Sequence, residues 1–214
     1  MEFLKLKSGT DIRGVASDGV AAEPVTLTDE VVEAIAASFL VWCERHLEKT
    51  SAGLRVAVGH DSRISADRIS ACLKRVFLCY GVHMLDCGLA STPSMFMATM
   101  DLPCDCSVQI TASHHPFHRN GLKFFTGEGG LDSPDITEIL QGAQENAKPG
   151  VLREGVYERV GYMSAYAERL RKTIQEGVRA EEYEHPLHGF HIVVDAGNGA
   201  GGFYATEVLA PLGA

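Results

Sequence analysis

The chain has 214 residues, of which 45% are hydrophobic and 22% are charged, and its formal net charge is −9 at pH 7. This composition supports a folded protein with a buried core and argues against a disordered chain. An acidic chain does not attract polyanions, so nucleic acid and anionic membrane surfaces are not expected partners, whereas a local group of basic side chains can still bind a small anion.

In chain order, the predicted elements alternate between strands and helices. Apolar residues at helical spacing predict helices at 28–43, capped by Thr28, at 65–80, ended by Gly81, and at 163–176. Two further helices are expected to begin at about Pro93 and at Ser133-Pro134-Asp135, where Ser133 is the predicted cap. Short apolar runs predict strands at 54–58, 82–86, 107–110 and 122–126. This alternation predicts an α/β fold, a three-layer α/β/α sandwich around a mixed, mostly parallel sheet.

The C-terminal part of the sequence has a different pattern. Residues 178–188 are polar and predict a linker, after which 191–194 predict a strand and 203–212 a helix. A lone strand and helix cannot bury a core, so we expect one domain at 1–187 and the beginning of a truncated second domain at 188–214. The glycines at 197, 199 and 202 fit the dinucleotide-binding pattern, but the acidic residue expected about twenty positions later would lie at or beyond the end of the sequence. Glycines of a tight turn are the preferred interpretation.

The cysteines and the first residues bear on the cellular compartment. The six cysteines show no C-x-x-C spacing, which favours reduced, buried thiols inside the cell. The start of the sequence lacks the apolar stretch of a signal peptide, and no run reaches the ~18 apolar residues of a transmembrane helix. These observations predict a cytoplasmic protein.

The segment T-A-S-H-H-P-F-H-R-N-G-L-K, residues 111–123, carries the strongest chemical signal. Ser113 is followed within ten positions by His114, His115, His118, Arg119 and Lys123. Cationic donors around one hydroxyl suit phosphate binding, and a hydroxyl nucleophile needs a base or cation nearby. From composition alone, a turn with solvated histidines is an equal alternative. A zinc loop lacks Cys or acidic partners at ligand spacing, and a serine hydrolase lacks the G-x-S-x-G elbow.

The same segment resembles the active-site serine loop of the α-D-phosphohexomutase superfamily, the phosphoglucomutases and phosphomannomutases. That pattern, T-[AG]-S-H-N-P followed by N-G-x-K, is matched by Thr111, Ser113, His114, Pro116, Asn120, Gly121 and Lys123. The sequence departs from it at His115, where most members carry Asn. Three further segments resemble the family in the expected order: S-G-T-D-I-R-G at 8–14, one glycine shorter than the family pattern, G-H-D-S-R-I-S at 59–65, and V-V-D-A-G-N-G-A-G at 193–201.

The resemblance implies an intramolecular phosphotransferase that interconverts hexose 1-phosphate and hexose 6-phosphate through a phosphoserine and a bound bisphosphate. Ser113 would carry the phosphoryl group, Lys123 would be the general acid/base, His114 would orient the transferring group, and Arg13 would hold charge at the site. Mg²⁺ would bind Ser113 through its phosphate, and a hexose 1,6-bisphosphate would be the activator.

In that family the metal carboxylates belong to a D-G-D-x-D-R-type loop of the second domain, and the sugar and terminal-phosphate loops belong to the third and fourth domains. None of these occurs in the sequence, so we expect these 214 residues to be inactive as a mutase on their own. Two alternatives use the same fold: a non-catalytic module that binds phosphate or a partner, and a phosphatase that hydrolyses the phosphoserine.

Overall fold

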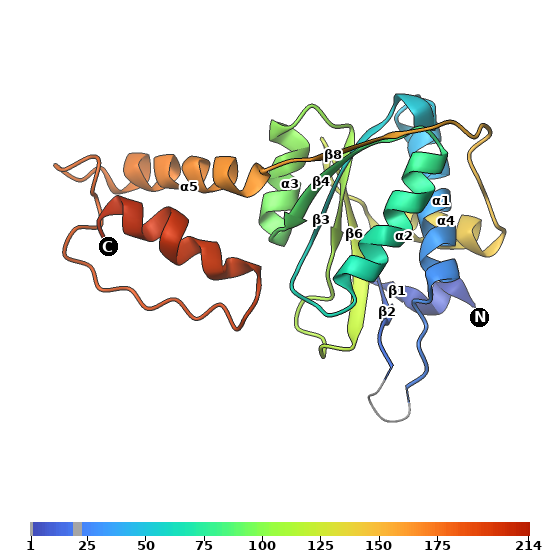
Figure 1. The fold of residues 1–214 in the computed structure, drawn as a ribbon, viewed down its shortest axis with the longest axis horizontal. Coiled ribbons are helices and arrows are strands. Elements are labelled where there is room, and N and C mark those ends of the chain that lie inside the picture. The colour runs from blue at the N-terminus through green and yellow to red at the C-terminus, as the bar shows by residue number, and fades with distance from the viewer. Residues whose placement is uncertain (1, 19–22) are drawn as a thin grey trace.

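Eight strands form one sheet in the computed structural model, which describes residues 2–18 and 23–214 (Figure 1). The strands are β1 (Lys7–Ser8), β2 (Asp11–Val15), β3 (Arg55–His60), β4 (His83–Leu89), β5 (Cys106–Ile110), β6 (Arg119–Thr126), β7 (Gly129–Gly130) and β8 (Val156–Arg159). Their order is β1-β2-β6-β5-β3-β4-β8, and β7 pairs with β6. Strands β5, β3, β4 and β8 are parallel to one another. Strand β6 is antiparallel to β5, and both β2 and β7 are antiparallel to β6. Strands β2 and β7 therefore have the same direction as β5. The predicted mixed, mostly parallel sheet is confirmed.

Helices cover both faces of this sheet. They are α1 (Asp29–His46), α2 (Ala66–Cys79), α3 (Thr92–Asp101), α4 (Ser133–Gln144) and α5 (Tyr162–Val178), with short helical turns η1 (Phe3–Leu6), η2 (Ser51–Gly53), η3 (Ala200–Gly202), η4 (Tyr204–Leu209) and η5 (Ala210–Leu212). Figure 1 shows α1, α2 and α4 on one side of the sheet and α3 on the other. The predicted three-layer α/β/α sandwich is therefore confirmed.

The larger hydrophobic core lies between the sheet and α1, α2 and α4. Phe39 of α1 packs against Phe77 of α2 and Phe124 of β6, with ring centroids 6.4 and 4.4 Å apart. All three rings are buried, and each such side chain contributes roughly 1.5–3 kcal/mol of hydrophobic free energy. A smaller core under α3 holds Met95 and reaches Tyr162 at the start of α5. The sheet that positions the serine loop is thus held from both faces.

Helix caps explain where α1 and α4 begin. Thr28 caps α1 as predicted, since its Oγ1 accepts the Val31 N–H at 3.4 Å. The predicted cap of α4 is wrong by one residue, because Asp132 and not Ser133 precedes the helix. Asp132 Oδ1 accepts the Asp135 N–H at 3.1 Å, and Asp135 Oδ2 accepts the Asp132 N–H at 2.9 Å. This reciprocal pair is a capping box, which Ser133 could not share with Asp135.

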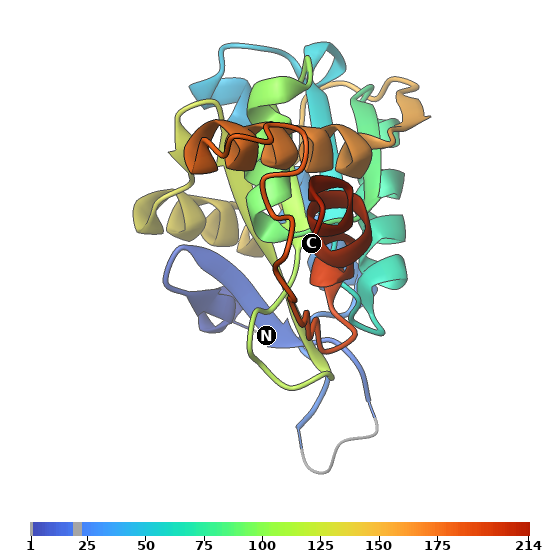
Figure 2. The same cartoon turned by 90° about the vertical axis from the view of Figure 1, so that its left-hand side faces the viewer.

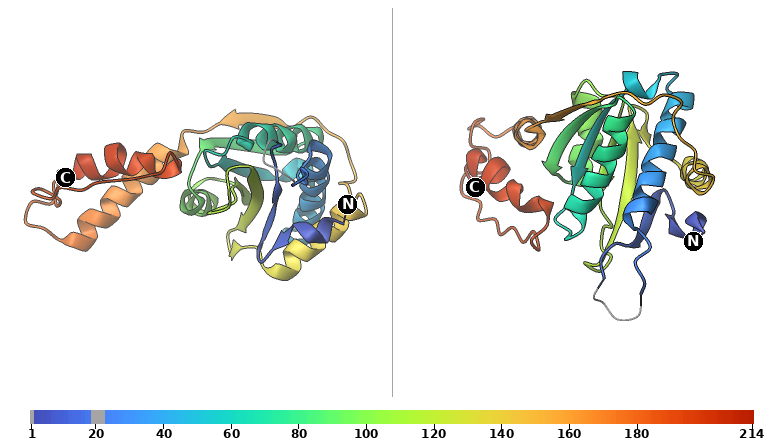
Figure 3. Two further views of the ribbon diagram at one scale, coloured as in Figure 1. Left: turned by 90° about the horizontal axis from the view of Figure 1, so that it is seen from below. Right: turned by 45° about the vertical axis from the view of Figure 1, so that its right-hand side comes forward.

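The predicted strand at 191–194 is wrong: within 23–214 the structure assigns these residues to no strand. A strand needs a hydrogen-bonded neighbour, and no described strand lies beside this segment. The predicted helical segment at 203–212 is confirmed in its position along the chain. Its turns are π and 3-10 turns, not α-helical ones. Val208 and Leu212 of this segment pack on Ala167 of α5, so the two run side by side (Figure 3). Figure 2 turns this projecting part toward the reader. The boundary between 187 and 188 stays a prediction.

The expectation of buried thiols is met at four of the six cysteines. All six are free thiols; Cys43, Cys72, Cys87 and Cys106 are buried, Cys104 is partly exposed and Cys79 is exposed. Burial, with a smaller effect of neighbouring acidic groups, raises the pKa of Cys87 to about 12.

Among the helices of the described chain, none has the length and apolar character that crossing a membrane requires.

Candidate functional site

The serine loop connects β5 to β6 at the carboxyl end of β5. Ser113 lies in the left-handed region with φ of 54°, a conformation that a residue with a side chain rarely adopts. Two hydrogen bonds fix the turn: the Ser113 N–H donates to Thr111 Oγ1 at 3.2 Å, and the His115 N–H donates to Ala112 O at 3.1 Å. Ser113 itself is exposed, and its Oγ lies 3.4 Å from His114 Nδ1. The loop therefore presents the hydroxyl and one imidazole to solvent.

Strand pairing brings Arg13 to this loop. In the β2–β6 ladder Arg13 lies opposite Gly121, and its Nη1 donates to the Ala112 carbonyl at 3.0 Å. Its Nη2 donates to Asp11 Oδ2 at 2.7 Å. Arg13 Nε is buried and has no hydrogen-bond acceptor among the described residues. Two of the five guanidinium donors of Arg13 are thus paired with described acceptors, and the cation lies against the serine loop at Ala112, a position that suits interaction with an anion.

Lys123 is linked to Arg13 through a buried carboxylate. Lys123 Nζ lies 2.9 Å from Asp11 Oδ1, so Asp11 is an ion-pair partner of both cations. The carboxylate side chain is 8% exposed, whereas Lys123 is 28% exposed and can still reach a ligand. The structure thus places His114 against Ser113, Arg13 against the Ala112 carbonyl that precedes it, and Lys123 beside Arg13 through Asp11.

Gly121 allows β2 and the serine loop to approach this closely. A Cβ at this position would lie 2.1 Å from the Ile12 carbonyl oxygen and 2.9 Å from that of Thr111. The neighbouring Asn120 is fully buried; its side-chain amide donates to Ser65 Oγ at 3.0 Å, and its Oδ1 accepts the Gly121 N–H at 2.9 Å. The Asn-Gly pair therefore locks the return strand of the loop to the start of α2.

Asp61 and Arg63 complete the site from the loop after β3. Asp61 Oδ2 accepts the Thr111 hydroxyl at 2.7 Å and the Arg63 Nε–H at 3.2 Å. Strands β3 and β5 are parallel neighbours, so the residues after both meet at the same edge of the sheet. The sequence matched this segment to the family without giving it a role. Asp11, Asp61 and Arg63 are the residues that sequence reasoning missed.

The basic residues that follow Ser113 do not all surround it. His118 is buried with its Nε2 3.4 Å from Glu23 Oε2, and Arg119 Nη2 donates to the same oxygen at 2.7 Å. The pKa of His115 is lowered, first by burial and then by the positive charge of Arg13 and neighbouring cations. A positive local environment therefore exists at the loop despite the negative net charge of the chain.

The acidic side chains near Ser113 are already paired. In residues 2–18 and 23–214, no three or more His, Cys, Asp or Glu side chains come together in a way that could hold a metal ion, those of the serine loop included. Near Ser113, Asp11 is engaged by two cations and Asp61 by Arg63 and the Thr111 hydroxyl. These side chains do not by themselves fit the oxygen-rich shell that Mg²⁺ takes.

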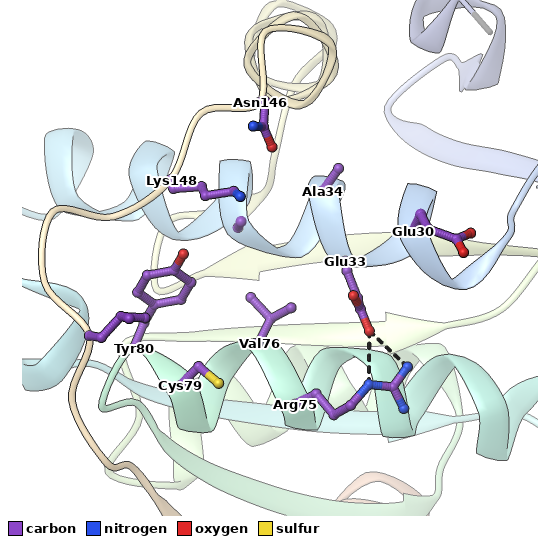
Figure 4. A pocket seen from close by; sticks show the side chains of 11 residues that line it. Glu30, Glu33, Ala34, Arg75, Val76, Cys79, Tyr80, Asn146 and Lys148 are labelled. Atoms are coloured by element: carbon purple, nitrogen blue, oxygen red, sulfur yellow. Dashed lines mark hydrogen bonds and ion pairs between the residues drawn. The ribbon is translucent and has the colours of Figure 1, made fainter.

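A groove of about 440 Å³ lies elsewhere, between α1, α2 and the residues after α4 (Figure 4). Across its mouth Arg75 Nε donates to Glu33 Oε1 at 2.8 Å, and Tyr80 lines its other end. None of the residues that line it belongs to the serine loop. The candidate site is instead the open edge of the sheet that carries Ser113.

Comparisons with known proteins identify the family of the chain. The family described as "Phosphoglucomutase/phosphomannomutase, alpha/beta/alpha domain I" matches residues 5–149. A phosphoglucosamine mutase of Shouchella clausii is 33% identical over 172 residues, which cover 78% of this chain and 37% of that protein. A phosphoglucosamine mutase of Syntrophomonas wolfei is 32% identical over 213 residues, 96% of this chain and 44% of that protein.

A solved structure of a phosphoglucomutase/phosphomannomutase family protein from Burkholderia thailandensis has a TM-score of 0.69 and 23% sequence identity, over 96% of this chain and 41% of that chain. This likeness supports the fold alone. The chain spans less than half the length of the curated relatives that it matches. The match to domain I covers more than half of the chain and includes Arg13, Arg63, Ser113 and Lys123. The chain therefore belongs to the phosphoglucomutase/phosphomannomutase family.

Proposed function

We propose that Ser113 carries the phosphoryl group in a phosphohexose mutase reaction, in which hexose 1-phosphate and hexose 6-phosphate interconvert through a bound hexose 1,6-bisphosphate. One observation carries the proposal: an exposed serine hydroxyl, held in a left-handed turn, lies 3.4 Å from the His114 imidazole, and the Arg13 guanidinium bonds the carbonyl of the preceding residue. Family membership and the names of the relatives at 32–33% identity support it.

Each named side chain has a place in this reaction. A hydroxyl of the sugar phosphate attacks the phosphorus of phosphorylated Ser113, and the bond from phosphorus to Oγ breaks. Lys123 as the neutral amine would take the proton of the sugar hydroxyl, and Asp11 at 2.9 Å would hold the ammonium that forms, while the leaving Ser113 Oγ takes a proton from water. Arg13 would stabilise negative charge on the transferring group. His114, 3.4 Å from Oγ, would orient it. After the bisphosphate turns round, the same steps run in reverse.

The proposal includes Mg²⁺, which would be bound by the phosphate on Ser113. A phosphate on Oγ would add oxygen ligands that the described side chains do not offer, and a bound Mg²⁺ supplies Lewis-acid stabilisation of phosphate charge. The steps above depend only on side chains of this chain. A hexose 1,6-bisphosphate is the proposed activator, because it can phosphorylate Ser113.

Glucosamine phosphate is the first substrate to test, because the relatives reported above are named phosphoglucosamine mutases. A hexose phosphate is the proposed partner, with no nucleic acid and no membrane, in keeping with the net charge of −9. The cytoplasm remains the predicted compartment.

Intact-mass measurement tests the proposal. After incubation with glucosamine 1,6-bisphosphate or glucose 1,6-bisphosphate and Mg²⁺, the full chain should gain the mass of one phosphoryl group. Ser113→Ala should gain none, while Ser164→Ala, at an exposed serine of α5, should gain it as the parent chain does.

The other possible results of this measurement distinguish the two alternative functions. No mass gain in the parent chain would contradict the phosphoserine and favour a non-catalytic binding module. Release of inorganic phosphate without an isomer would favour a phosphatase. The expectation that the 214 residues do not isomerise sugar phosphates on their own stays a prediction, which the same samples test by separating the two hexose phosphates.

A further inference from the structure

Arg63 makes a hydrogen bond with each of its five guanidinium N–H donors. Its Nε donates to Asp61 Oδ2 at 3.2 Å. The other four donors bond backbone carbonyl oxygens of the serine loop, those of Ser113 (2.5 Å), His115 (2.8 Å), Pro116 (2.7 Å) and Arg119 (2.9 Å). A guanidinium has five donors in all, so Arg63 keeps none for a phosphate. Its side chain is only 11% exposed. Any influence of Arg63 on the reaction therefore passes through the loop.

These bonds set the orientation of the peptide group after Ser113. The described chain contains no cis peptide bond, and in a trans peptide the N–H points opposite to the C=O. Because the Ser113 carbonyl points to the Arg63 guanidinium, the His114 N–H points away from Arg63. No hydrogen-bond acceptor in 2–18 or 23–214 takes this N–H. It is a donor directed to solvent next to the Ser113 hydroxyl.

The peptide group before Ser113 is fixed by a second chain of hydrogen bonds. The Thr111 hydroxyl donates to Asp61 Oδ2 at 2.7 Å, so its oxygen is free to accept the Ser113 N–H at 3.2 Å. Asp61 in turn accepts from Arg63, through both its backbone N–H and its Nε. Both peptide groups that flank Ser113 are thus tied to one Asp–Arg pair. These bonds offset the conformational cost of a left-handed, non-glycine backbone at Ser113.

We propose that Arg63 is a positioning residue for phosphoryl transfer at Ser113. It holds four carbonyl oxygens of the loop toward its guanidinium, and this turns the His114 N–H toward the phosphate. The inference rests on the proposed function of Ser113 and adds a residue that touches neither the phosphate nor the sugar. In physical terms, Arg63 neutralises the negative ends of the loop dipoles, so that a positive end faces the phosphate.

The rate at which the full chain is phosphorylated on Ser113, followed by intact mass against the concentration of glucose 1,6-bisphosphate, tests this role. Arg63→Ala should lower the maximal rate about 100-fold, since small errors of position cost that much. The half-saturating concentration should stay within about twofold, because Arg63 does not contact the ligand. Arg63→Lys keeps the charge but loses the planar fork, so its rate should lie between the two. Guanidinium ion in the buffer should restore part of the rate of Arg63→Ala.

Arg68 offers a matched control. Its guanidinium also bonds two backbone carbonyls, those of Ala16 and Leu27, and one carboxylate, that of Asp29, but none of these lies in the serine loop. Arg68→Ala should keep the parent rate within about twofold and should not respond to guanidinium ion. A parent-like maximal rate in Arg63→Ala would overturn the inference. So would an unchanged rate with a raised half-saturating concentration, which would place Arg63 on the ligand.

Hydrogen exchange separates this inference from the proposed function. Arg63→Ala should speed exchange of the backbone amides at 111–121 by roughly tenfold, whereas Arg68→Ala should leave them unchanged. If the parent chain takes up no phosphate, the proposed function fails, and exchange alone then decides whether Arg63 fixes the loop. Unchanged exchange in Arg63→Ala refutes it. Should Arg63→Ala not fold, Arg63→Lys takes its place in both measurements.

Discussion

Gly121→Ala places a methyl group where β2 and the serine loop lie closest to β6. The added Cβ would lie 2.1 Å from the Ile12 carbonyl oxygen and 2.9 Å from that of Thr111, and real Cβ atoms essentially never come within 3.0 Å of another heavy atom. Both oxygens belong to the backbone, so no side chain can rotate to make room. Either β2 moves away from β6, or the start of the serine loop moves away from both.

The cost follows from this geometry. Overpacking a close contact costs typically 1–3 kcal/mol, and a clash with two backbone atoms puts Gly121→Ala near the upper end, about 3 kcal/mol. For a chain of this length, 1 kcal/mol lowers Tm by roughly 2–4 °C, so we expect a drop of about 6–12 °C. The same movement separates Arg13 from the Ala112 carbonyl, so phosphorylation of Ser113 should slow as well.

Thermal and urea unfolding followed by circular dichroism measures the effect. Gly127→Ala is the control, because a Cβ there meets nothing within 4 Å and the residue is not left-handed. It should unfold within about 2 °C of the parent chain. If Gly121→Ala unfolds within the same interval, the close approach of β2 to β6 is wrong, and so is the reasoning built on it.

Two further predictions concern the charges of the site. Asp11→Asn leaves Arg13 and Lys123 without their shared carboxylate, so the free energy of unfolding from urea titration should fall by about 3 kcal/mol, and an unchanged value would contradict the pairing. His115 should titrate by NMR below its ordinary pKa near 6.5, because burial and then the charge of Arg13 disfavour the imidazolium. With a depressed folded-state pKa, its contribution to stability is present above the unfolded pKa and is lost as pH falls through the folded one. Phosphorylation of Ser113 should raise this pKa, and a midpoint at or above 6.5 without phosphate would refute the assignment.

Elements with local signals were predictable from the sequence, whereas elements formed by distant pairing were not. Helix α1 has both a cap at Thr28 and a long apolar face, so its position followed from neighbouring residues. Strand β2 contains Asp11 and Arg13 among five residues and gave no apolar run; it is a strand because it pairs with β6, over 100 positions away. The segment 191–194 is the converse case, with a strand-like pattern and no neighbouring strand in the described chain.

The same distinction applies to the site. Ser113, His114 and Lys123 stand in a loop whose residue types indicate phosphate chemistry, and Arg13 stands in a segment that resembles the family motif, so the sequence pointed to all four. Asp11 lies in the same motif as Arg13, but nothing in the residue spacing shows that Asp11 pairs with Lys123 on another strand. Arg63 bonds backbone carbonyls of a loop about 50 positions later, and Asp61 bonds the Thr111 hydroxyl at the start of that loop. Contacts between segments so far apart have no signature in the local residue pattern.

The left-handed backbone of Ser113 limits which hydroxyl amino acid this position accepts. Threonine carries the same nucleophilic group, but its Cβ bears a methyl, and a β-branched residue with positive φ is a genuine conformational outlier. Serine and threonine thus carry chemically equivalent hydroxyls, but the backbone conformation at this position distinguishes the two residues. At most sites where the two residues interchange freely, side-chain chemistry decides the outcome; at this turn, the shape of the main chain decides it first.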